Sequence, residues 1–272
     1  MNKLTHIVLF TFFVTVINMS AQSKRVYTIN DNWQFHKGDL SFVPSAIRKE
    51  NRVNTGDTWE AISIPHTWNN TDTTDDTAGY YRGVGWYKKT IHIGAKSEGN
   101  NNRTLIYFEG VNQVADVYVN EEWVGKHQGG YTKFHFDITA LLNYGKKNIL
   151  AVKVDNSHNK DIPPLSADFT FFGGIYRDVF LMQLNDIHFS KDDYSSSGVF
   201  ITTPNVSKEM SKIQINCLLS SELNKNKTIN LINRIVDKKG NIVSESTQKV
   251  KIKKHAKNFS VKKVFSIDNP SL

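Results

Sequence analysis

The stretch that decides the fold is PPLSADFTFFGGIYRDVFL, residues 163–181. Two prolines open it, an aromatic run follows, and the pair Gly173 and Gly174 precedes an apolar segment. Two adjacent glycines permit a tight turn or a positive φ angle, so we expect the chain to turn here and then enter a strand. Arg177 and Asp178 lie at this entry, and we expect them to pair with each other as structural residues.

Alternating apolar and polar residues on both sides of this stretch predict further β-strands. Residues 134–138 and 150–154 each place apolar side chains on one face, and no segment shows a convincing helical stripe. The pair Gly129 and Gly130 predicts another tight turn. Short strands at this spacing, with turns between them, predict an all-β chain that forms a sandwich or a jelly roll.

The aromatic residues gather in the first half of the chain, and all five tryptophans precede residue 124. Trp86 and Tyr87 could form a platform for stacking a sugar ring. Aromatic residues at strand periodicity are more often part of a core, and we expect both in the core. We also expect Trp123 and Val124 to pack inside the sandwich.

A second group of strands follows a polar break near residues 186–197. We predict a first β-domain at residues 22–187 and a smaller, immunoglobulin-like β-sandwich at residues 195–272. The residues from Asp237 to Gly240 predict a hairpin turn within the second unit. About five strands are expected there, fewer than the seven of an immunoglobulin fold, so this unit either ends on an edge strand or is cut.

The N-terminus has the layout of a secretory signal peptide. Lys3 gives a positive start, residues 7–17 are apolar, and the small pair Ser20 and Ala21 follows. We expect residues 1–21 to be removed and the protein to be secreted or periplasmic. An uncleaved anchor is the alternative, but the apolar run is short for a membrane span, and nothing later in the chain is long and apolar enough to be one.

Charge and cysteine content narrow the function classes. Residues 205–272 hold 14 Lys and Arg against 5 Asp and Glu, so the whole basic excess of the chain lies there. These lysines alternate along predicted strands with few aromatic residues between them, which favours a solvated face or an acidic partner domain over nucleic acid. The one cysteine, Cys217, is expected on the buried face of a strand as an inert thiol.

Seven sequence blocks share one pattern with a known family. In chain order they are IPHTW at 64–68, GVGWYKKT at 83–90, YFEGV at 107–111, ADVYVN at 115–120, WVGKHQGGYTKFHFDIT at 123–139, NILAVKVDN at 148–156 and GGIYRDV at 173–179. Together they resemble the N-terminal sugar-binding domain of glycoside hydrolase family 2, which includes β-galactosidases, β-glucuronidases and β-mannosidases. The resemblance implies a galactose-binding-like jelly-roll β-sandwich for the first unit. The second unit resembles the family's immunoglobulin-like domain through its order and strand content alone.

The resemblance implies retaining glycosidase chemistry, which uses two carboxyl groups about 5 Å apart. In the family both are glutamates on a TIM barrel, which takes about 250 residues. Only 87 residues follow Asn185, and they show no alternation of strands and helices. We therefore assign no catalytic residue to this chain and expect it to be inactive alone. No histidine cluster has the spacing of metal ligands, so neither a metal nor a cofactor is expected.

The resemblance also indicates how this domain could contact a carbohydrate. In the β-galactosidases, an aspartate six residues before the second glycine of the last block contacts a sugar hydroxyl. Asp168 stands six residues before Gly174, and a carboxylate accepts hydrogen bonds strongly from hydroxyl groups. The polar loop at residues 69–83 supplies two further candidates, Asp75 and Asp76.

Two functional hypotheses follow from these observations. The chain is either the N-terminal, carbohydrate-binding portion of a secreted β-galactosidase-like hydrolase of O-glycosidic bonds, or a stand-alone carbohydrate-binding or adhesion module. The first expects a catalytic barrel as partner, encoded just downstream, and the second expects glycan binding by the purified chain. Neither hypothesis identifies whether the bound sugar is a galactoside, a glucuronide or a mannoside.

Overall fold

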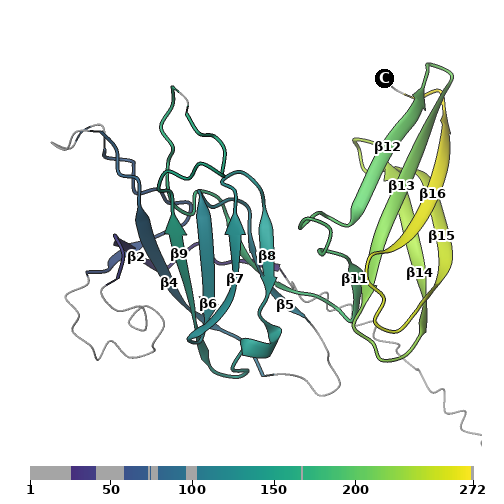
Figure 1. Cartoon of the computed structure of the whole chain (residues 1–272). Coiled ribbons are helices and arrows are strands. Elements are labelled where there is room, and N and C mark those ends of the chain that lie inside the picture. Colours follow the sequence, from purple (N-terminus) through teal and green to yellow (C-terminus); the bar gives the residue numbers. More distant parts are fainter. Residues whose placement is uncertain are drawn as a thin grey trace, which may run out of the picture.

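The computed structural model describes residues 26–40, 58–72, 74, 79–95, 103–166 and 168–270. The described chain consists of strands and one short 3₁₀ helix, η1 (Thr139–Leu141), which confirms the predicted all-β fold (Figure 1). The predicted signal peptide lies outside the described residues. Within them, no helix is long and apolar enough to cross a bilayer.

The first unit is a sandwich of two antiparallel sheets. The six-stranded sheet consists, in spatial order, of β3 (Glu60–Ile62), β2 (Trp33–Lys37), β4 (Val84–His92), β9 (Lys147–Asp155), β6 (Val114–Val119) and β7 (Glu122–Gln128). The four-stranded sheet consists of β1 (Val26–Thr28), β10 (Val179–Gln183), β5 (Thr104–Phe108) and β8 (Phe134–Asp137). The stretch containing the two glycines continues into β10. This strand pairs with β1 in the four-stranded sheet, so the stretch leads directly into the sandwich.

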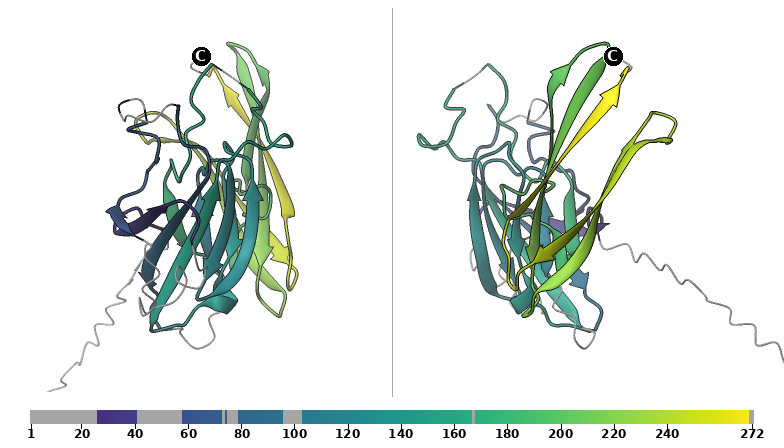
Figure 2. Two further views of the ribbon diagram at one scale, coloured as in Figure 1. Left: turned by 60° about the vertical axis from the view of Figure 1, so that its left-hand side comes forward. Right: turned by 90° about the vertical axis from the view of Figure 1, so that its right-hand side faces the viewer.

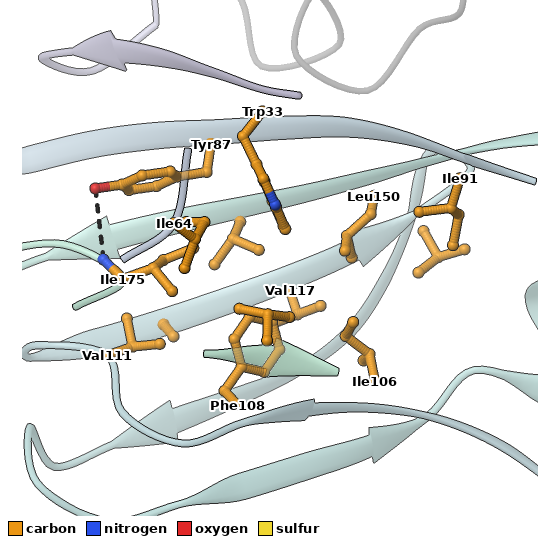
Figure 3. Close-up of a cluster of buried hydrophobic side chains, with 14 of the residues drawn as sticks. Trp33, Ile64, Tyr87, Ile91, Ile106, Phe108, Val111, Val117, Leu150 and Ile175 are labelled. Carbon is orange, nitrogen blue, oxygen red and sulfur yellow. Dashed lines mark hydrogen bonds between the residues drawn. The ribbon is translucent and has the colours of Figure 1, made fainter. Parts of the chain in front are cut away.

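The core lies between the two sheets (Figure 3). Tyr87 is fully buried there, and its hydroxyl accepts a hydrogen bond from the backbone N–H of Ile175 at 3.4 Å. Trp86 is also fully buried, but on the outer face of the six-stranded sheet, where it packs with Leu40 and half-buried Tyr118. Both aromatic residues are therefore structural, as predicted.

The prediction for Trp123 is wrong. Its side chain is 57% exposed, and its indole N–H donates to Asp116 Oδ1 at 3.1 Å, while neighbouring Val124 packs against the core. Successive side chains of a strand point to opposite faces, so the two residues cannot both enter one core.

The second unit has its own core and two sheets (Figure 2). One sheet has β13 (Met210–Ser221) at its centre, and its other strands are β11 (Ile187–Phe189), β12 (Val199–Val206) and β16 (Phe259–Asp268). The other is the hairpin β14 (Lys227–Val236) and β15 (Ile242–Ile252).

Two predictions in this unit are confirmed. The hairpin turns where expected, since Gly240 has a φ of +87° and its N–H bonds to the carbonyl of Asp237 at 3.0 Å. Cys217 is buried in the core, and burial raises the pKa of its thiol, so it is a poor nucleophile.

Candidate functional site

The loop that carries Asp168 rises beyond the end of the sandwich (Figure 1). It begins after β9 and ends at the glycine pair. Asp168 is exposed, and no hydrogen bond or ion pair joins its side chain to another described residue. Three apolar side chains of the loop, Leu165, Phe169 and Phe172, are each about half exposed, at 52%, 55% and 48%. The loop thus presents a free carboxylate beside apolar surface.

Three buried amide side chains hold the base of this loop. Asn156 Nδ2 donates to the carbonyl of Phe171 at 2.9 Å. Asn112 Nδ2 donates to the next carbonyl, that of Phe172, at 2.6 Å. Asn69 Oδ1 then accepts from the N–H of Gly173 at 2.7 Å. Since each amide comes from a different segment, three consecutive loop residues are tied to three parts of the sandwich.

The glycine pair allows the loop to approach the sandwich this closely. A Cβ atom on Gly173 would lie 2.1 Å from the ring of Trp68, which is itself buried. Gly174 has a φ of +121°, and a Cβ there would lie 2.6 Å from the carbonyl oxygen of His66. Both positions therefore require glycine, for space and, at Gly174, also for backbone conformation.

Asp72 is a buried carboxylate at the start of the polar loop. Its Oδ2 accepts hydrogen bonds from Asn69 Nδ2 at 2.5 Å and from the N–H of Tyr81 at 2.8 Å. Its Oδ1 lies 3.8 Å from Lys37 Nζ. These contacts connect the polar loop to the amide that holds Gly173, so Asp72 is a positioning residue.

The other predicted residues have different outcomes. Asp75 and Asp76 lie outside the described residues, so their distance from Asp168 stays untested. Arg177 and Asp178 do not pair with each other: both precede β10, and no ion pair joins their side chains. Asp178 instead accepts a hydrogen bond from Asn30 Nδ2 at 2.9 Å, and the guanidinium of Arg177 lies 5.7 Å from the ring centre of Tyr176.

We expect Asn156→Ala to lower the free energy of unfolding by about 2–4 kcal/mol. The substitution leaves two groups without a partner, the part-buried N–H of Gly83, from which Asn156 Oδ1 accepts a hydrogen bond at 2.8 Å, and the buried carbonyl of Phe171. Asn159→Ala is the matched control, because Asn159 accepts only an exposed N–H, that of Asp161. Urea unfolding measures both variants, and equal losses would contradict this role for Asn156.

The described residues contain no group of three or more His, Cys, Asp or Glu side chains placed to hold a metal ion. What the loop offers chemically is an exposed hydrogen-bond acceptor, suited to a neutral polar ligand such as a hydroxyl group.

Residues 23–185 match the family model described as "Glycosyl hydrolases family 2, sugar binding domain". The chain is 38% identical over 197 residues to a β-glucuronidase of Bacteroides fragilis, covering 72% of this chain and 26% of that protein. It is 39% identical over 189 residues to a β-galactosidase of Thermoanaerobacter pseudethanolicus, covering 65% of this chain and 25% of that protein.

The solved structure of a Bacteroides uniformis β-glucuronidase is similar, with a TM-score of 0.79 at 33% sequence identity. The match covers 91% of this chain and 28% of that enzyme. It therefore includes the second unit as well as the sandwich. The chain spans about a quarter of the length of the curated relatives that it matches.

Proposed function

Because this chain belongs to glycoside hydrolase family 2, we propose that it is the carbohydrate-binding portion of a longer β-glycosidase, and that it contributes to a sugar pocket on a catalytic domain. One observation carries the proposal, the match of residues 23–185 to the family's sugar-binding domain. The reaction would be hydrolysis of O-glycosidic bonds. Similarity to β-glucuronidases and β-galactosidases favours a β-glucuronide or a β-galactoside as substrate.

Within this function, Asp168 is proposed to accept a hydrogen bond from a hydroxyl group of the terminal sugar. The amides at the loop base support this role, since fixing residues 171–173 on the sandwich reduces the number of loop conformations that binding would have to restrict. The exposed apolar residues Leu165, Phe169 and Phe172 would face the catalytic domain. Asp75 and Asp76 are proposed as additional sugar contacts.

Two further properties are proposed on sequence grounds. Residues 1–21 act as a signal peptide and direct the protein to the periplasm or the exterior. The second unit acts as an immunoglobulin-like domain between the sandwich and the catalytic domain, supported by its two sheets with a separate core.

A chimeric enzyme tests the proposed function. Residues 23–272 of this chain would replace the matching quarter of the Bacteroides uniformis β-glucuronidase, a match that covers 91% of this chain and 28% of that enzyme at 33% identity. We expect the chimera to hydrolyse 4-nitrophenyl β-glucuronide, and the same enzyme without that quarter to be inactive. A folded chimera, verified by circular dichroism, that shows no more activity than the shortened enzyme would count against the proposal.

A further inference from the structure

A cleft of about 890 Å³ lies between the sandwich and the segment that leads to the second unit. Figure 1 shows that segment between β8 and the second unit. The cleft is separate from the loop of Asp168, because none of the residues 156–173 lines it. Its volume lies within the range typical of small-molecule sites, about 300–1,000 Å³.

The wall formed by the connecting segment is held in place by hydrogen bonds. Ser195 is buried, its Oγ lies 2.8 Å from His135 Nδ1, and its carbonyl accepts from the hydroxyl of Tyr107 at 3.4 Å. Asp192 is bound by Arg103, whose Nη1 lies 3.3 Å from Asp192 Oδ1. These three contacts join the connecting segment to the sandwich, so this wall of the cleft is held in a defined position.

Arg103 also connects the two units. Its Nε lies 2.8 Å from Asp137 Oδ2 in the sandwich, and its Nη1 lies 3.6 Å from Glu222 Oε1 in the second unit. Although burial alone would raise the pKa of Asp137, hydrogen bonds from Thr139 and Arg103 hold this pKa below its usual range. Asp137 is therefore charged at neutral pH, and Arg103 binds the carboxyl groups of both Asp137 and Asp192.

Two exposed tyrosines line the cleft. Tyr131 is 56% exposed, and Tyr194 is 93% exposed. Tyr194 has a φ of +47°, an uncommon backbone conformation that the contacts of neighbouring Ser195 support. A tyrosine ring combines an apolar face with a polar tip, which suits the face and the hydroxyl groups of a sugar ring.

The cleft also contains cationic groups without carboxylate partners. Lys133, Lys191 and Arg177 line it, and no ion pair with a described carboxylate holds any of them. Burial, and then the positive charge of Lys133, lower the pKa of Lys191, whose ammonium group donates to the carbonyl of Ser196 at 3.0 Å. Adjacent like charges are unfavourable unless a counter-charge binds between them. Glu109 is the one lining carboxylate in the described chain that Arg103 does not bind.

We propose that this cleft binds an acidic oligosaccharide, with Tyr131 and Tyr194 contacting sugar rings and Lys133, Lys191 and Arg177 binding its carboxylate or sulfate groups. The cleft is a second carbohydrate site, apart from the loop of Asp168. It does not depend on the proposed catalytic partner, because every lining residue belongs to this chain.

Isothermal titration calorimetry on the full chain at low salt tests the proposal with three tetrasaccharides. Tetragalacturonate carries carboxylates, a κ-carrageenan tetrasaccharide carries sulfate esters, and maltotetraose is neutral. We expect at least one acidic probe to bind at least tenfold more tightly than maltotetraose, and the better of the two identifies the acidic group. Sodium sulfate at the same charge concentration should bind at least tenfold more weakly than that probe.

Variants locate the binding. We expect the double substitution Lys133→Gln and Lys191→Gln, and separately Tyr194→Ala, to weaken binding of the acidic probe at least tenfold. Lys249→Gln with Lys251→Gln is the matched control, because it removes two exposed positive charges on β15 and should leave binding unchanged.

Several outcomes would overturn the proposal. The first two are binding of the neutral probe, or of sodium sulfate, as tight as that of the acidic probe. The third is a loss of binding in the β15 control equal to that in the cleft variants. The fourth is no binding of either acidic probe by a chain that circular dichroism shows to be folded.

Discussion

Gly174→Ala is expected to lower the free energy of unfolding by about 3–5 kcal/mol, a large part of the stability of an ordinary domain. Two costs combine at this position. The φ of +121° strains any residue with a side chain, by about 1–3 kcal/mol. The new Cβ would also lie 2.6 Å from both the carbonyl oxygen of His66 and the hydroxyl of Tyr87.

Neither neighbour of Gly174 can move easily. The backbone of His66 is held by a hydrogen bond from its N–H to the carbonyl of Ile175 at 2.8 Å. Tyr87 is fully buried in the core. Crowding of this kind adds about 1–3 kcal/mol.

Gly79→Ala separates the two costs. Gly79 also has a positive φ, +83°, but no atom lies within 4 Å of the position of its Cβ. We therefore expect Gly79→Ala to show the backbone cost alone, about 1–3 kcal/mol. Urea unfolding of the full chain measures both variants, and an equal loss in the two would show that close packing at Gly174 is unimportant.

The sequence predicted the features that depend on local chemistry. Alternation predicted the strands, and glycine pairs predicted the turns. At the pair Gly129 and Gly130, for example, Gly129 has a φ of +122°, and a Cβ on Gly130 would lie 2.2 Å from Asn112 Oδ1. These predictions hold because a two-residue period and a missing Cβ act within a few residues of chain.

The features that the sequence did not predict depend on contacts between distant segments. Asn69, Asn112 and Asn156 look like ordinary turn residues, yet they bind three consecutive loop residues. Only the paired sheets bring them together. The position of Asn156 immediately after a strand in the VDN sequence was the one available signal.

The cleft was missed for the same reason. It is lined by residues near 131–136 and by residues 191–195, which are far apart in the sequence, so their proximity in space could not be predicted. Trp123 was misplaced because the similarity of a sequence block does not show which face of the sheet a residue occupies. Alternation along the strand places Val124 toward the core and Trp123 toward solvent.

Asp168→Asn is expected to reduce kcat/KM of the chimeric β-glucuronidase about 10- to 100-fold, since a hydrogen bond to a charged group contributes about 1.5–3 kcal/mol. Asparagine keeps the size of the side chain and removes its charge. The loop base does not involve the Asp168 side chain, so stability should change little.

Asp161→Asn is the matched control, because Asp161 is an exposed aspartate on the same loop. The most direct measurement is therefore kcat/KM of the two variants beside the parent chimera, on 4-nitrophenyl β-glucuronide. We expect a loss of at least tenfold for Asp168→Asn and of less than twofold for Asp161→Asn. Equal values for the two variants would contradict the claim that this loop completes a sugar pocket.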